Sequence, residues 1–193
     1  MDGAKGKVVS MKTYTIIGGI NGAGKSSLSG VLKTQKNLGE IIDIDKIAQI
    51  NNISNIEAGK TALKKINDYF ENGITFTQET TLSANQPLKA VQTAKNNSYF
   101  IRLFYVGLDT ADESIKRIAN RVSKGGHNIN SEDVERRFSK RFETLIKILP
   151  YCDEVIFFDN DNGFKEVAEY TNGELIYRTN YKPLWLTALS DKL

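Results

Sequence analysis

The sequence predicts an α/β domain in which a parallel five-stranded sheet carries helices on both faces. Apolar runs rich in β-branched and aromatic residues alternate along the chain with stretches of helical periodicity, and this alternation favours a parallel sheet. The first run, residues 13–17, leads directly into a glycine-rich loop, as a buried parallel strand does. The length of 193 residues, 40% of them hydrophobic and 25% charged, fits a single domain over residues 1–193.

Turn and capping residues place the boundaries of the predicted elements. Asn72-Gly73 closes the second long helix, and Gly125-Gly126 interrupts the helical region after the fourth strand. Ser131, with two acidic residues behind it, is a typical N-cap for the last long helix. The predicted strands span residues 13–17, 41–45, 74–79, 99–106 and 155–159, and the predicted helices span 25–36, 55–70, 88–94, 114–124 and 131–149.

Both ends of the chain depart from this alternation. Asn172-Gly173 lies between residues 165–170 and 175–179, which predicts a C-terminal β-hairpin within residues 163–180. Residues 1–12 are expected to form a flexible extension, and Met11 is a candidate natural start.

Composition argues against several functional classes. Lys and Arg total 26 against 23 Asp and Glu, and the net charge of +3 gives no indication of a nucleic-acid partner. The single His and the single Cys, Cys152, offer neither a zinc cluster nor an internal disulfide, as is typical of the reducing cytoplasm. Residues 1–10 lack an apolar run that could serve as a signal peptide or membrane span, so no membrane partner is expected.

The loop after the first strand has the spacing of a phosphate-binding loop: Gly19, four residues, then Gly24-Lys25-Ser26. Its glycines let main-chain N–H groups curl around phosphate oxygens, Lys25 neutralises the β- and γ-phosphates, and the Ser26 hydroxyl can ligate Mg²⁺. The following helix adds the positive end of its dipole. The sequence therefore predicts ATP and Mg²⁺ as cofactors, Ser26 as a metal ligand, and nucleotide contacts from Asn21, Gly22, Ala23, Gly24, Lys25, Ser26 and Ser27.

Carboxylates end three of the predicted strands. Asp43 and Asp45 close the second strand and, because side chains alternate along a strand, both are expected to face the edge where substrates bind. Asp45 could then take the proton of a substrate hydroxyl, or could cap the next helix. Glu79 and Thr81 could hold a magnesium-bound water or the acceptor, or could cap the third strand. Asp159 is expected near the nucleotide base rather than the metal, or in a solvated turn.

Residues 111–142 are expected to form a helical lid that carries most of the arginines. Arg137 borders the apolar stripe of its helix, and Arg121 shares a face with Arg117. Guanidinium groups suit the charge that spreads over a transferring phosphoryl group, although a salt-bridged surface is the alternative for each. His127 is expected at the lid tip rather than in catalysis. The five arginines are Arg117, Arg121, Arg136, Arg137 and Arg141.

Together these motifs resemble the zeta-toxin-like P-loop kinases. The resemblance runs from about residue 13 to residue 160 and rests on residues 18–26, 43–48, 79–82, 105–108, 117–121, 125–127, 136–138 and 158–160. It implies a kinase sheet with a basic lid, ATP with Mg²⁺, and phosphorylation of a UDP-activated amino sugar, UDP-N-acetylglucosamine at its 3′-hydroxyl being the best-known substrate. It also implies that Asp45 is the general base, that Glu79 and Thr81 contact the acceptor, and that Arg121 and Arg137 clamp the γ-phosphate.

The functional hypothesis is an ATP:alcohol phosphotransferase with the catalytic residues Lys25, Asp45, Arg121 and Arg137. Its expected partners are a small-molecule substrate and, by the resemblance, an antitoxin as a further candidate. The short chain after Asn160 leaves open a kinase for another small metabolite or nucleotide. A nucleotide-gated binding module is the third alternative, against which the carboxylates at two strand ends argue.

Overall fold

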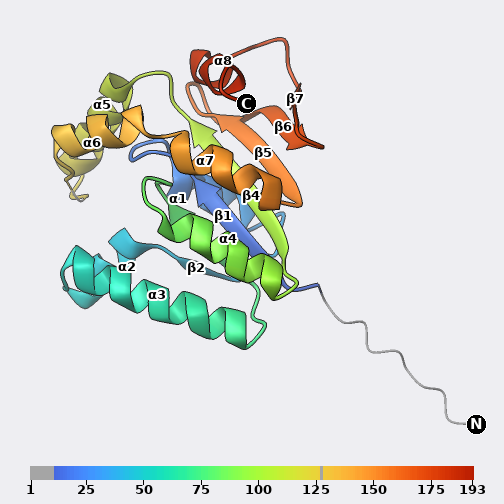
Figure 1. The fold of residues 1–193 in the computed structure, drawn as a ribbon. Coiled ribbons are helices and arrows are strands. Elements are labelled where there is room, and N and C mark those ends of the chain that lie inside the picture. The colour runs from blue at the N-terminus through green and yellow to red at the C-terminus, as the bar shows by residue number, and fades with distance from the viewer. Residues whose placement is uncertain (1–10, 127) are drawn as a thin grey trace, which may run out of the picture.

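Figure 1 shows the protein as a computed structural model that describes residues 11–126 and 128–193. The expectations for residues 1–10 and for His127 lie outside the described residues. The strands are β1 (Thr13–Gly18), β2 (Glu40–Ile42), β3 (Phe76–Thr80), β4 (Phe100–Gly107), β5 (Glu154–Asp159), β6 (Lys165–Thr171) and β7 (Glu174–Tyr177). The helices are α1 (Lys25–Leu32), α2 (Ile44–Asn51), α3 (Asn55–Glu71), α4 (Gln86–Asn96), α5 (Ala111–Ser123), α6 (Ser131–Ser139), α7 (Glu143–Ile148), the 3₁₀ turn η1 (Leu149–Tyr151) and α8 (Leu184–Ser190). None of these described helices combines the length and apolar character needed to cross a membrane.

The described strands form one sheet in the order β2-β3-β1-β4-β5-β6-β7. The first five in this order run parallel, which confirms the predicted parallel core of the fold. β1 lies in its middle, with Gly18 opposite both Thr80 of β3 and Tyr105 of β4. Because parallel strands share a carboxyl edge, the loops that follow β1, β3 and β4 start side by side.

The predicted hairpin forms, but it extends the main sheet. β6 pairs antiparallel with β5, and β7 with β6, so the described sheet has seven strands, where a five-stranded sheet with a separate hairpin was expected. Asn172 and Gly173 have φ values of 53° and 86°, as a two-residue hairpin turn requires. Adding the hairpin covers the edge of β5 that would otherwise expose unpaired main-chain groups.

Helices cover both faces of the sheet, as predicted. Tyr14 and Ile16 of β1 belong to a core that also contains residues of α3, α4, α7 and α8. Ile17 belongs to the core on the opposite face, which also contains buried side chains of α1. Ile20 and Ala23 of the glycine-rich loop are buried in this second core, so packing fixes the loop at the edge of the sheet.

The helix predicted over residues 131–149 is divided into α6 and α7. The chain turns between them, where the guanidinium of Arg141 lies 3.8 Å from the ring centroid of Phe138 and 4.4 Å from that of Phe142. Phe142 is buried in the core, and Phe138 packs against the opposite core beside the glycine-rich loop. The apolar stripe runs through this turn, so its periodicity does not reveal the break.

Helix α8 lies beyond the predicted elements and ties the ends of β4 and β5 together. Trp185 is buried against the rings of Tyr105 and Phe157. Its indole N–H donates to Asp159 Oδ1 at 2.9 Å, and its main-chain N–H donates to Asp109 Oδ1 at 2.8 Å. Trp185 therefore links α8 to the edge of the sheet where ligands bind in folds of this class.

Replacing Trp185 by alanine is expected to lower the free energy of unfolding by about 3–5 kcal/mol, because it leaves a cavity beside the sheet. Urea unfolding followed by circular dichroism measures the change. Leu184→Ala is a matched control on the same helix, because Leu184 is 72% exposed and its loss should change stability by about 0.5 kcal/mol or less. Wild-type stability in Trp185→Ala would contradict this account of α8.

Candidate active site

The glycine-rich loop joins β1 to α1 in a conformation that depends on its glycines. Gly24 has a φ of 102°, and a Cβ there would lie 2.4 Å from Asn160 Nδ2. Gly19 has a φ of 145°, and its Cβ would lie 2.5 Å from the carbonyl oxygen of Val106. The tight loop leads straight into the N-terminus of α1 at Lys25. A loop of this shape before a helix N-terminus fits the phosphates of a nucleotide.

Lys25 lies within electrostatic range of four of the charged residues that the sequence singled out. Desolvation by the loop lowers the pKa of the Lys25 ammonium, the carboxylates of Glu79, Asp43 and Asp45 raise it, and the guanidinium of Arg121 lowers it. A charged side chain shifts the pKa of another group in this way only when the two groups lie near each other. The fold therefore brings Asp45, Glu79 and Arg121, each from a different element, within electrostatic range of Lys25.

Glu79 at the end of β3 is buried against α1. Its Oε2 accepts a hydrogen bond from Ser26 Oγ at 2.8 Å, and its Oε1 accepts one from Ser29 Oγ at 2.5 Å. A serine hydroxyl carries one proton and two lone pairs, so donation to Glu79 leaves the lone pairs of Ser26 to face a cation. These contacts place Glu79 beside the candidate metal ligand, whereas the resemblance implied a contact with the acceptor.

The structure corrects the prediction for Asp43 and Asp45. β2 ends at Ile42, and Asp43 is the N-cap of α2, accepting hydrogen bonds from the main-chain N–H groups of Asp45 at 3.0 Å and Lys46 at 3.4 Å. Ile44 is therefore helical rather than part of a strand, because the cap outweighs its β-propensity. Burial, together with the charges of Glu79 and Asp45, raises the pKa of Asp43. Asp45 is exposed in the first turn of α2.

Asp45 lines a cleft of about 520 Å³. The walls come from α2, from the turn into α3, and from the two glycines that follow α5, Gly125 and Gly126. This volume lies within the usual range for small-molecule sites. Sequence reasoning missed the polar side chains in the cleft. Spacing could have indicated Gln49, because it lies one helical turn after Asp45, but no motif marks Asn52 or Asn55.

Helices α5 and α6 pack against each other and span most of the region that was predicted to form a lid (Figure 1). From α6, Arg137 Nη1 donates to Oδ1 of the loop residue Asn21 at 2.7 Å. From α5, Arg121 is exposed and lies close enough to influence Lys25. Arg137 of α6 thus bonds directly to the glycine-rich loop, whereas Arg121 of α5 acts on Lys25 through its charge.

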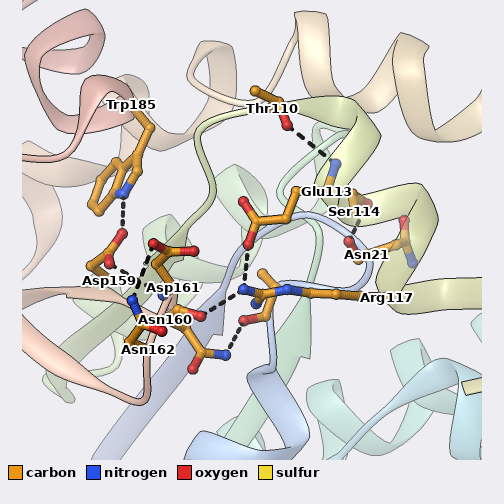
Figure 2. Close-up of polar contacts among 11 residues, drawn as sticks. Asn21, Thr110, Glu113, Ser114, Arg117, Asp159, Asn160, Asp161, Asn162 and Trp185 are labelled. Carbon is orange, nitrogen blue, oxygen red and sulfur yellow. Dashed lines mark hydrogen bonds and ion pairs between the residues drawn. The ribbon is translucent and has the colours of Figure 1, made fainter. Parts of the chain in front are cut away.

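The other lid arginines make local contacts. Arg117 pairs with Glu113 and donates from Nη2 to the carbonyl oxygen of Asn160 at 2.7 Å, as Figure 2 shows. Arg136 pairs with Asp133 at 2.6 Å on the exposed side of α6. For these two arginines, the ion pairs fit the alternative of a salt-bridged surface.

Three further residues complete the predicted set. Asp159 is buried and accepts the indole N–H of Trp185, which fits a structural role (Figure 2). Thr81 Oγ1 lies 2.7 Å from Ser83 Oγ in the loop after β3, and Ser27 is exposed in the first turn of α1. No contact in the described residues brings Thr81 or Ser27 to the cluster around Lys25.

The sequence matches no family model. A protein of Haemophilus influenzae (strain ATCC 51907 / DSM 11121 / KW20 / Rd), described as uncharacterized, is 35% identical over 125 residues, which cover 62% of this chain and 88% of the relative. The chain belongs to the family of this Haemophilus protein. A match of this identity indicates that the two chains share their fold over the 125 matched residues.

Solved structures resemble this family member in fold. One chain of the AvrRxo1-ORF1:-ORF2 complex with ATP superposes with a TM-score of 0.68 at 16% identity, over 95% of this chain and 65% of that one. The chain thus spans slightly less than two thirds of that relative's length. A chain of the PezAT chromosomal toxin-antitoxin system of Streptococcus pneumoniae superposes with a TM-score of 0.58 at 17% identity, over 95% and 85% of the two chains. The chain therefore has the zeta-toxin-like P-loop kinase fold.

Proposed function

We propose that the protein is an ATP-dependent small-molecule kinase that transfers the γ-phosphoryl group to an alcohol. The observation that carries this proposal is the position of Asp45, which lies near Lys25 and also lines the cleft. A carboxylate between a phosphate loop and a small-molecule cleft is the arrangement that phosphoryl transfer to a hydroxyl needs. The acceptor favoured by the resemblance is a UDP-activated amino sugar, with UDP-N-acetylglucosamine at its 3′-hydroxyl as the first compound to test.

The residues of the loop would hold the triphosphate. Lys25 and the N-terminus of α1 offset the negative charge of the β- and γ-phosphates. Ser26, oriented by Glu79, would supply a ligand to Mg²⁺, which when bound withdraws charge from the phosphate oxygens. Asn160 fixes this side of the loop, because its Nδ2 donates to the carbonyl oxygen of Ala23 at 2.9 Å.

The remaining site residues would act on the acceptor and on the transferring group. Asp45 accepts the proton of the attacking hydroxyl, and the cap formed by Asp43 fixes the first turn of α2 that carries it. Arg121 and Arg137 stabilise the charge on the phosphoryl oxygens. The packed helices α5 and α6 exclude water, which would otherwise compete with the acceptor.

An antitoxin is the protein partner that we propose. One of the similar solved structures is a complex of AvrRxo1-ORF1 with -ORF2, and another belongs to the PezAT toxin-antitoxin system. Co-purification of this chain with the product of an adjacent reading frame tests the proposal.

The function is tested by incubating the protein with ATP, Mg²⁺ and a panel of UDP-sugars, nucleosides and free alcohols, followed by mass spectrometry of the products. A UDP-amino sugar that gains one phosphate supports the proposal in full. Phosphate on another alcohol keeps the kinase and reassigns the acceptor. ATP binding with no phosphorylated product, together with a nucleotide-dependent change in partner affinity, would replace the kinase with a binding module.

Replacing Glu79 by glutamine is expected to raise the Mg²⁺ concentration needed for half-maximal transfer by about 10–100-fold. The change keeps the shape of the side chain but removes the charge that orients the Ser26 hydroxyl. A magnesium titration of the initial rate measures the effect. Glu71→Gln, at the exposed end of α3, is the matched control. Identical titrations for Glu79→Gln and wild type would remove Glu79 from the metal site.

A further inference from the structure

We infer that Asn21 is a positioning residue that joins both lid helices to the phosphate loop and sets the place of Arg137. The inference rests on the proposed function and goes beyond it, because it gives the Asn21 side chain a role that loop spacing does not reveal. Positioning of this kind would couple the conformation of the loop to the placement of an arginine needed for transfer.

Asn21 makes one hydrogen bond to each lid helix. Its side-chain Oδ1 accepts from Arg137 Nη1 of α6 at 2.7 Å, and its main-chain oxygen accepts from Ser114 Oγ of α5 at 2.5 Å. Figure 2 shows Ser114 directed toward the main chain of Asn21. Both acceptors belong to a residue that is only 5% exposed, so water competes little for these bonds.

Packing holds the lid and the loop together around this residue. Ser114 is fully buried, and its carbonyl oxygen would lie 2.9 Å from a Cβ added to Gly22 of the loop. On α6, Phe138 follows Arg137 and packs against the core that contains Ile20 of the loop. The bonds of Asn21 therefore lie within a close-packed contact, and a change in the loop would be transmitted to both helices.

The amide of Asn21 suits this role better than a carboxylate would. A neutral oxygen fixes a guanidinium without cancelling its charge, so Arg137 keeps its full attraction for a phosphoryl group. A guanidinium also carries five N–H donors, so one bond to Asn21 is compatible with further bonds to phosphate oxygens. An aspartate at this position would pair with Arg137 and repel the triphosphate.

A double-mutant cycle between Asn21 and Arg137 tests the coupling. Asn21→Ala is expected to lower kcat by about 10–100-fold, while the Kd for ATP changes by about threefold or less. In the Arg137→Ala background, the same change should have almost no further effect. Asn21→Asp should lower kcat and also weaken ATP binding. Asn67→Ala, on the exposed side of α3, controls for loss of an asparagine. Independent effects of the two alanine substitutions would overturn the inference.

Hydrogen exchange separates this inference from the proposed function. In Asn21→Ala, and equally in Arg137→Ala, the amides of α6 are expected to exchange about fivefold faster than in wild type, as loss of one hydrogen bond would produce. The amides of α3 should be unchanged. Faster exchange in a protein that phosphorylates no acceptor would retain the positioning role and reject the kinase. Unchanged exchange in an active kinase would reject the positioning role alone.

Discussion

Replacing Asp45 by asparagine is expected to lower the rate of phosphoryl transfer by about 10²–10⁴-fold and to leave ATP affinity within about twofold of wild type. Asp45 lines the cleft that we propose for the acceptor, so its loss would remove the proposed proton acceptor and leave the glycine-rich loop intact. The kcat from a coupled assay and the Kd from calorimetry, measured on the same preparation, give the two quantities.

Asp43→Asn is the matched control for this prediction. Asparagine caps a helix as well as aspartate does, so α2 should keep its N-terminus in this variant. The two carboxylates lie two residues apart, yet only Asp45 lines the cleft. We therefore expect Asp43→Asn to retain most of the activity. A variant pair in which Asp43→Asn is inactive and Asp45→Asn is active would transfer the role of general base to Asp43.

Replacing Lys25 by methionine is expected to lower kcat/KM for ATP by about 10³-fold or more, with losses in both affinity and rate. Methionine keeps the packing of the aliphatic stem but removes the ammonium that lies among Glu79, Asp43 and Asp45. Without it, these carboxylates would repel the triphosphate.

Lys33→Met, at the exposed C-cap of α1, should behave as wild type in the same assay. Nucleotide titration by calorimetry and initial rates at saturating ATP separate the two losses in Lys25→Met. Wild-type ATP binding and turnover in that variant would refute the assignment of the loop as the phosphate site.

The phosphate loop and the parallel core could be predicted because their signals are local. A run of β-branched residues, three spaced glycines and a lysine specify a strand, a tight turn and a helix start within residues 13–25. The prediction was wrong at Asp43, where isoleucines on both sides favour a strand but one side-chain cap starts a helix. A cap depends on a hydrogen bond that residue pattern alone does not fix.

The rest of the site depends on contacts between distant segments. The bond between Asn21 and Arg137 spans 116 positions, and the cleft brings α2 together with the glycines after α5. Neither has a spacing that a single sequence reveals. The pairing of the β6–β7 hairpin with β5 could not be predicted either, because the sequence does not specify which strand edge a hairpin joins. The hydrogen bond from Trp185 of α8 to Asp159 likewise has no signal in the sequence.

Trp185 is the only tryptophan of the chain, and its position gives the molecule an intrinsic fluorescent probe. The indole bonds to Asp159, and the next residue, Asn160, bonds to the phosphate loop at Ala23. A change in the loop therefore reaches the fluorophore through two adjacent residues. Ligand titrations and stopped-flow traces can be recorded on the unlabelled protein, with no dye near the lid.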